Sequence, residues 1–324
     1  MSVCSSYIVG KSNPTPKSDI RMDLTTSQPV EPIPEPDPLP STIAHLIDSD
    51  GSFMANDVSR SSRKSMTEVG FLGRLSHPNI VKLLGYCKEN ENFLIVYELM
   101  QKGRLNYHLF GKSSDRLLPW KTRIKIMMGM AKGLCYLHTM EKPIIYRDFK
   151  SSNVILNQTK HFIQRYQSLT CYSLAFLLYC KISNFGLAMW GPADNSYVTA
   201  QVAGKVGYID PEYVAIGKLY VKSDVYSFGV VSVEMLTGLR PIDKRRPLEQ
   251  ENLVNWAKPS LVHKRRLRQI MDPRLEGRYS IKEALQIAQL AYKCLNENPI
   301  YRPSMKEVAE MFEQIGDRYI IGEA

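Results

Sequence analysis

The chain has 324 residues, of which 44% are hydrophobic and 23% are charged, as in globular proteins that bury a large core. This composition excludes disorder for the bulk of the chain. No apolar run reaches the roughly 18 to 20 residues of a membrane span. The net charge is +10, but the basic residues are scattered, with Lys244–Arg246 and Lys264–Arg266 the densest groups. Scattered charge is typical of a solvated surface and predicts no nucleic-acid partner and at most peripheral membrane association.

The six cysteines are also informative about location. They include no Cys-x-x-Cys pair and no histidine partner at metal-ligand spacing. This favours a reducing compartment. We therefore expect a cytoplasmic protein, with the inner face of the plasma membrane as the alternative location.

Residues 1–60 differ in composition from the rest of the chain. Proline, serine, threonine and aspartate dominate, and six prolines fall between Pro29 and Pro40. Proline lacks a backbone N–H and does not fit helix interiors, so this density predicts an extended, mobile tail.

Residues 61–100 show the first regular periodicity. Apolar residues at helical spacing between Ser65 and Leu75 predict an amphipathic helix that ends before Pro78. Two apolar runs follow, Ile80–Cys87 and Phe93–Leu99, and the polar residues between them predict an antiparallel hairpin.

The remainder of the chain, 101–316, is mostly helical in pattern, with 317–324 as a short tail. Strands followed by helices predict an α+β fold. The helix-like stretches are 104–110, 120–140, 223–238, 249–262, 280–296 and 304–316.

The segment Tyr146–Asn153 carries the clearest chemical pattern. It reads Tyr-Arg-Asp-Phe-Lys-Ser-Ser-Asn and is followed by three apolar residues. Phosphoryl transfer needs a carboxylate to orient the attacking hydroxyl, a cation near the transferred phosphate and an oxygen ligand for magnesium. Asp148, Lys150 and Asn153 supply these three chemical types, so we predict that Asp148 and Lys150 are catalytic.

Further motifs follow in the order found in protein kinases, and together they resemble that family. Lys181–Gly186 is similar to the metal-binding D-F-G segment, with Asn184 in place of the aspartate. Ile209–Glu212 is similar to A-P-E. The resemblance implies that Asp224 anchors the catalytic loop and that Arg302 pairs with Glu212.

The segments Leu75–Cys87, Val96–Glu98 and Ile145–Lys150 resemble those of plant receptor-like cytoplasmic Ser/Thr kinases. The resemblance implies a kinase-like fold with a complete, mainly helical C-lobe over 101–316 and a residual N-lobe over 61–100. It implies ATP and Mg²⁺ as cofactors and a receptor kinase or another kinase as protein partner. Asn153 and Asn184 match the magnesium ligands, and the positions that match nucleotide-binding residues are Glu68, Tyr97, Glu98, Met100 and Asn153.

Four departures weaken the predicted nucleotide site. No G-x-G-x-x-G turn and no V-A-x-K strand precede Glu68, and the neutral amide of Asn184 is a weaker magnesium ligand than a carboxylate. Lys205 stands where the family has threonine, so we expect it to form an ion pair with Asp148. The fourth departure is an insertion at 158–180, which we expect to be a poorly ordered loop.

Three functional hypotheses follow from these residues. The first is a catalytically impaired pseudokinase that acts in signalling by binding a partner. The second is an active ATP-dependent Ser/Thr kinase, and the third is a truncated or mis-spliced relative without function. Ser196 and Thr199 lie where activation-loop phosphorylation sites occur, with Arg147 as the expected phosphate partner, although ordinary exposed hydroxyls are the simpler interpretation.

Overall fold

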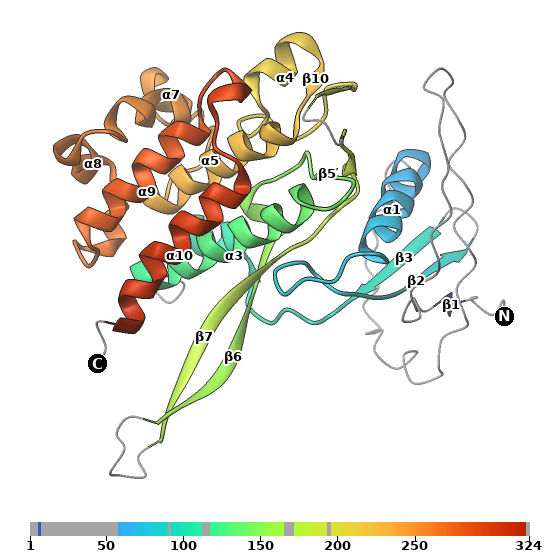
Figure 1. The fold of residues 1–324 in the computed structure, drawn as a ribbon, viewed down its shortest axis with the longest axis horizontal. Helices are drawn as coiled ribbons and strands as arrows, with labels where there is room; N and C mark the ends of the chain where they lie inside the picture. The colour runs from blue at the N-terminus through green and yellow to red at the C-terminus, as the bar shows by residue number, and fades with distance from the viewer. Residues whose placement is uncertain are drawn as a thin grey trace. The chain divides into compact units, whose positions relative to one another are not determined.

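The computed structural model shown in Figure 1 falls into two compact units, which are described separately. The first unit comprises Met1–Leu75 and Lys82–Glu98, and the second comprises Ser76–Val81 and Leu99–Ala324. Most of the predicted tail, 1–60, lies outside the described residues. The residues described are 6–7, 58–89, 92–111, 117–164, 172–192 and 196–321.

The first unit combines one helix with a three-stranded antiparallel sheet. The strands are β1 (Ser6–Tyr7), β2 (Leu83–Glu89) and β3 (Asn92–Tyr97), in that spatial order. The helix α1 (Val58–Leu72) contacts β2 and β3 and buries Val69. The predicted hairpin is therefore present, and the helix begins earlier than its apolar spacing indicates.

Two details of the first unit differ from expectation. Ser6 and Tyr7, within the predicted tail, pair with Cys87 and Tyr86 of β2. Cys87 is disulfide-bonded. The first turns of α1 are polar, so hydrophobic periodicity could not identify them.

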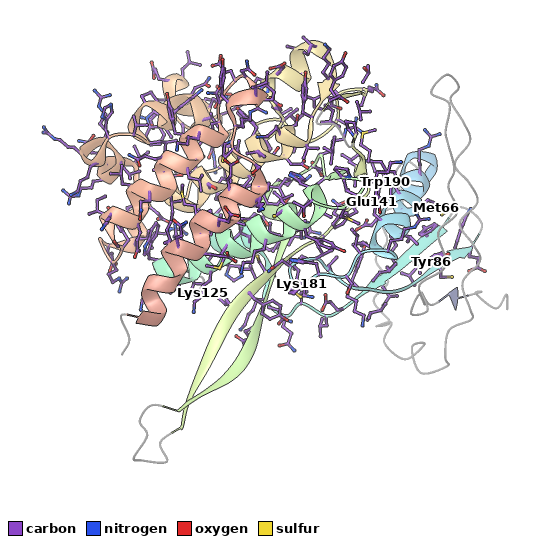
Figure 2. All side chains as sticks on the ribbon, viewed as in Figure 1. Met66, Tyr86, Lys125, Glu141, Lys181 and Trp190 are labelled. Carbon is purple, nitrogen blue, oxygen red and sulfur yellow. The ribbon has the colours of Figure 1, made fainter. Side chains whose placement is uncertain are left out.

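A buried helix forms the centre of the second unit. This helix, α5 (Val221–Thr237), buries every residue from Ser223 to Thr237. Helices α3 (Trp120–His138) and α9 (Ile281–Cys294) contact it, and α10 (Met305–Ile321) contacts α3. Side chains fill the space between these helices (Figure 2). Together with the sheet-containing first unit, this arrangement confirms the α+β prediction.

Shorter helices complete the second unit. The short helices α4 and α8 are absent from the prediction because they are too brief to establish a period. The helix α10 continues past residue 316, so the predicted tail 317–324 begins as helix. The short α-helices are α2 (Leu105–Phe110), α4 (Pro211–Ile216), α6 (Leu248–Glu251), α7 (Leu253–Ala257) and α8 (Lys264–Ile270), and the 3-10 helices are Ser151–Asn153, Lys258–Ser260, Pro273–Leu275 and Pro299–Tyr301.

Three small antiparallel sheets position the loops of the second unit. One joins β4 (Gly103–Arg104), β6 (Val154–Gln164) and β7 (Tyr172–Ile182) in that order. A second pairs β5 (Ile144–Ile145) with β8 (Met189–Trp190), and the third pairs β9 (Val198–Thr199) with β10 (Lys218–Leu219). The segment Tyr146–Asn153 thus lies between two strands.

The insertion at 158–180 contains two paired strands where we predicted a loop. Strands β6 and β7 pair continuously from Val154↔Ile182 to Gln164↔Tyr172, so most of the insertion lengthens a hairpin. Residues 165–171 lie outside the described residues. The physical reason for the correction is that the insertion is rich in aromatic residues and continues a ladder already begun at its base. Figure 1 shows this hairpin extending away from α3.

Among the described residues, no helix combines the length and the apolar character that crossing a membrane requires.

Candidate active site

A single carboxylate on α5 holds the start of the catalytic loop. Asp224 accepts hydrogen bonds from the backbone N–H groups of Tyr146 and Arg147, each at 2.7 Å, and His138 Nε2 lies 2.9 Å from its Oδ2. Arg147 adopts a left-handed backbone conformation, with φ of 71°, which is unusual for a residue other than glycine. Anchoring both N–H groups to a buried carboxylate offsets the strain of this conformation.

The catalytic loop brings Asp148, Lys150 and Asn153 together. Lys150 Nζ lies 2.6 Å from Asp148 Oδ2, and the Asn153 side-chain amide donates to the backbone oxygen of Asp148 at 2.9 Å. The same amide lies 3.2 Å from Asp148 Oδ2. Asp148 is only 8% exposed, so its carboxylate is oriented by these two neighbours rather than by solvent.

Three aromatic side chains pack against one another at the catalytic loop. Tyr146 is fully buried, with Phe149 and Phe185 in edge contact at 6.0 and 5.1 Å. Its hydroxyl donates to the backbone oxygen of Ser183, which directly precedes Asn184. The packing therefore ties the catalytic loop to the segment that resembles D-F-G.

Asn184 lies next to Asn153 in the structure. Its side-chain amide donates to Asn153 Oδ1 at 3.3 Å, and its φ of 64° is a conformation that asparagine tolerates better than most residues. The adjacent Ser183 donates its backbone N–H and its hydroxyl to the backbone oxygen of Asn153, at 2.9 and 3.0 Å. The two predicted magnesium ligands are thus in contact with each other.

This donor set does not fit a magnesium ion well. Asn153 Oδ1, the oxygen that would bind the ion, accepts a hydrogen bond from Asn184, and Asn184 contributes no charge. Asp148 is neutralised by Lys150. Over the part of the chain that the structure describes, no three His, Cys, Asp or Glu side chains are grouped as metal ligands. Magnesium prefers charged carboxylate oxygens, so we derive no chemical step through this ion.

Arg147 contacts the segment that follows Asn184. Its guanidinium donates to the Tyr213 hydroxyl at 2.8 and 3.1 Å and also to the backbone oxygen of Gln201. Ser196 and Thr199 are exposed, and Thr199 belongs to β9, where it pairs with Lys218. The expected phosphate partner of these two hydroxyls is therefore engaged with neutral oxygen acceptors.

The expected ion pair between Lys205 and Asp148 is absent, and this prediction was wrong. Lys205 is exposed, and Lys150 holds the Asp148 carboxylate instead. The physical reason is distance along the chain: Lys150 lies two residues from Asp148 and reaches it at little entropic cost, whereas an exposed lysine would lose solvation and rotamer freedom.

The predicted pairing of Arg302 with Glu212 was also wrong. Arg302 binds Asp210 through two parallel contacts of 2.6 and 2.7 Å, and both side chains are fully buried. Asp210 precedes Pro211 as the N-cap of α4 and accepts from the Glu212 backbone N–H at 3.1 Å. Asp210 is buried at the cap position, whereas Glu212 is the second residue of the helix and is half-buried.

The other predicted nucleotide-binding residues belong to different parts of the molecule. Glu68, Tyr97 and Glu98 are in the first unit, whereas Met100 is in the second. Burial, then the charge of Glu68 and a hydrogen bond with it, raises the pKa of Tyr97 above its usual range. The Glu68 side chain on α1 is thus bonded to Tyr97 on β3. Glu98 Oε1 accepts from the Lys82 backbone N–H at 2.7 Å.

One buried cluster of polar side chains in the second unit was not predicted from the sequence. The Tyr208 hydroxyl donates to Glu234 Oε1 at 2.6 Å and lies 3.3 Å from the Ser151 hydroxyl. Burial raises the pKa of the Glu234 carboxyl to about 8, although the hydrogen bonds with Tyr208 and Ser151 act in the opposite direction. A glutamate in an apolar helix pattern was the available signal, since such a residue needs a polar partner.

Comparisons with known proteins agree with this geometry. A protein-family model described as the protein kinase domain matches residues 53–312. PBL8 of Arabidopsis thaliana, named a probable serine/threonine-protein kinase, is 48% identical over 254 residues, which are 78% of this chain and 57% of the relative.

Two further relatives carry similar names. An EPD1-interacting receptor-like cytoplasmic serine/threonine-protein kinase of Nicotiana benthamiana is 47% identical over 273 residues, which are 84% of this chain and 53% of the relative. Its counterpart 5D of Gossypium barbadense is 49% identical over 256 residues, which are 79% of this chain and 52% of the relative. The chain thus spans a little over half the length of these curated relatives.

Proposed function

Since this chain belongs to the protein kinase family and is similar to plant receptor-like cytoplasmic Ser/Thr kinases, we propose that it is a catalytically impaired member. It acts in signalling by binding a protein partner rather than by transferring phosphate. The partner is a receptor kinase or another kinase, and the chain meets it in the cytoplasm or at the inner face of the plasma membrane.

The contact between Asn184 and Asn153 carries this proposal. Phosphoryl transfer depends on a metal ion that neutralises the charge developing on the phosphate oxygens. Here the two positions that resemble the ligands are neutral amides, and one donates to the oxygen of the other at 3.3 Å. A hard divalent cation would have to break this hydrogen bond and would gain no carboxylate in return.

The Glu68 side chain adds a second argument. In the family pattern this glutamate pairs with a lysine that holds the phosphates, and no V-A-x-K segment precedes it in this sequence. Its contact with Tyr97 gives the carboxylate a role inside the first unit that requires no nucleotide. The first unit can therefore serve as a binding surface without an ATP clamp.

Partner binding draws support from the relatives' names. Two of them are named for an interaction with EPD1, which is a property of those proteins. For this chain we propose only the class of partner, a kinase or receptor. A fold that has lost catalytic groups but keeps its core can retain a docking function, since function resides in sites and not in the fold.

One specific observation favours an active Ser/Thr kinase as the second candidate. Asp148, Lys150 and Asn153 remain in contact, so the catalytic loop itself is intact. An active enzyme would bind nucleotide with magnesium and would lose that activity on replacement of Asp148.

Thermal shift with ATP, with and without Mg²⁺, tests the proposal on the full chain. A ligand that binds only the folded state raises the melting temperature by mass action. We expect no magnesium-dependent shift for the natural sequence and none for Asn255→Asp, an exposed asparagine on α7 that receives the same substitution. Asn184→Asp restores a carboxylate and should increase any magnesium-dependent response.

A phosphorylation assay completes the test. A magnesium-dependent shift of the natural sequence, together with phosphate incorporation that Asp148→Asn abolishes, would establish the active kinase and overturn the proposal. The absence of a cooperative melt would instead favour the non-functional relative. Retention of a kinase or receptor partner by the Asp148→Asn variant is the positive result that partner binding requires.

A further inference from the structure

The short helix α8 presents an unusual concentration of positive charge. Its inner positions, Leu267 and Ile270, are buried. Five of its seven positions are exposed, and four of these are cationic: Lys264, Arg265, Arg266 and Arg268. Figure 2 shows nitrogen-tipped side chains standing outward at this end of the second unit. We call these four residues the α8 basic face.

The protein itself supplies no counter-charge for this face. Among the described residues, none of the four side chains forms an ion pair or a hydrogen bond. The stretch Asn252–Met271 contains no aspartate or glutamate. Helix α9 packs against α8, and its exposed charged side chains are Lys282 and Lys293. No carboxylate of this flanking stretch therefore neutralises the face.

These cations are unfavourable for the helix that carries them. Three lie in the first turn of α8, where the partial positive charge of the helix N-terminus opposes them and favours acidic residues. Lys264 and Arg268 are four residues apart, a spacing at which like charges repel. The N-cap, His263, makes no side-chain capping bond. Folding alone does not explain four cations here, and residues that oppose local stability are expected at functional surfaces.

We propose that the α8 basic face binds an anionic lipid surface, through the phosphate and carboxylate groups of the headgroups. Clusters of four or more Lys and Arg associate electrostatically with such membranes. Guanidinium groups bind phosphate oxygens through paired hydrogen bonds. Val262, two residues before α8, is 36% exposed and gives the same surface an apolar contact.

The shape and composition of the face favour a membrane over other anionic partners. The cavity of about 930 Å³ that Lys258 and Pro259 help to line includes no residue of α8, so this cavity is not a peptide groove on the basic face. No aromatic residue lies on α8 to stack against a nucleic-acid base. This inference concerns a different surface from the proposed kinase site and is independent of whether phosphate is transferred.

Vesicle co-sedimentation of the full, unacylated chain tests the proposal. We expect binding to vesicles of phosphatidylcholine with phosphatidylserine, little binding to phosphatidylcholine alone, and loss of binding as salt rises. Each basic residue near an anionic surface contributes about fivefold to partitioning. Replacing all four cations with glutamine should therefore reduce binding by at least about tenfold.

A matched control removes the same charge elsewhere. The quadruple variant Lys102→Gln, Lys125→Gln, Lys244→Gln and Lys306→Gln, all at exposed positions, should reduce binding much less. A second test variant, Lys264→Glu with Arg265→Glu, places acids in the first turn, where they favour the helix, so lost binding cannot be ascribed to unfolding. Equal binding by the natural chain and either α8 variant would overturn the proposal. Binding that is independent of phosphatidylserine, or binding to an acidic peptide or nucleic acid but not to vesicles, would also overturn it.

Discussion

Replacing Asp210 with asparagine should destabilise the second unit by about 3 to 5 kcal/mol, because the Arg302 guanidinium would remain buried without its carboxylate. Both side chains are fully buried, and two contacts of 2.6 and 2.7 Å join them. Asp210 also accepts from the Ser223 hydroxyl at 2.8 Å and caps α4. Asparagine keeps an oxygen for the cap, so the loss reports mainly the missing charge.

Urea denaturation monitored by circular dichroism measures this difference. The matched control is Glu212→Gln, which removes the same charge from a half-buried side chain two residues away. We expect this control to change the free energy of unfolding by less than about 0.5 kcal/mol. If Glu212→Gln costs as much as Asp210→Asn, Glu212 is the partner of Arg302 and the reasoning fails.

Three other predictions concern a buried carboxyl group, a single hydrogen bond and the hairpin of β6 and β7. Burial raises the pKa of Glu234 to about 8, so the folded state holds this proton more tightly than the unfolded chain; the free energy of unfolding should fall between pH 5 and 9 by about 4 kcal/mol, and Glu234→Gln should remove the fall. Equal free energies of unfolding in urea titrations at several pH values would contradict this. Tyr97→Phe removes the hydrogen bond with Glu68 and should cost about 1 to 2 kcal/mol, seen as faster amide exchange in α1 and β3; unchanged exchange would contradict it. Exchanging 159–177 for a short turn should shift the free energy of unfolding by only about 1 kcal/mol, because the base of the hairpin remains paired; loss of cooperative unfolding would refute this.

The sequence correctly predicted those helices and strands whose formation depends on residues close together in the chain. The helices around α5 and the hairpin of the first unit follow from apolar spacing, since burial of one face determines both. The catalytic loop could be identified because its chemistry requires Asp148, Lys150 and Asn153 at fixed spacing. The structure brings these three together and places Asn184 beside them.

Choices between distant partners could not be made from sequence. Arg302 needed a carboxylate, and Asp210 and Glu212 were both available two residues apart; only the direction in which α4 leaves its cap separates them. For Asp148, two lysines competed, and the one nearer in sequence made the contact. Motif spacing indicates which residue types meet, but the orientation of a short helix decides which of them do.

The prediction of a loop at the insertion was wrong for a different reason. It departs from the family pattern and was predicted to be a loop, yet strand formation requires only a compatible pattern beside an existing ladder. Because β6 and β7 are already paired at Val154↔Ile182, each further pair extends structure instead of starting it.

The same hairpin determines the spacing at the candidate site. Asn153 directly precedes β6, and Ser183 and Asn184 directly follow β7, so the register of the two strands sets which residue stands opposite Asn153. A slip of two residues along β7 would move Asn184 by about 7 Å and bring another side chain against the catalytic loop. The strand register, rather than the length of the insertion, is therefore the quantity that mutation must preserve.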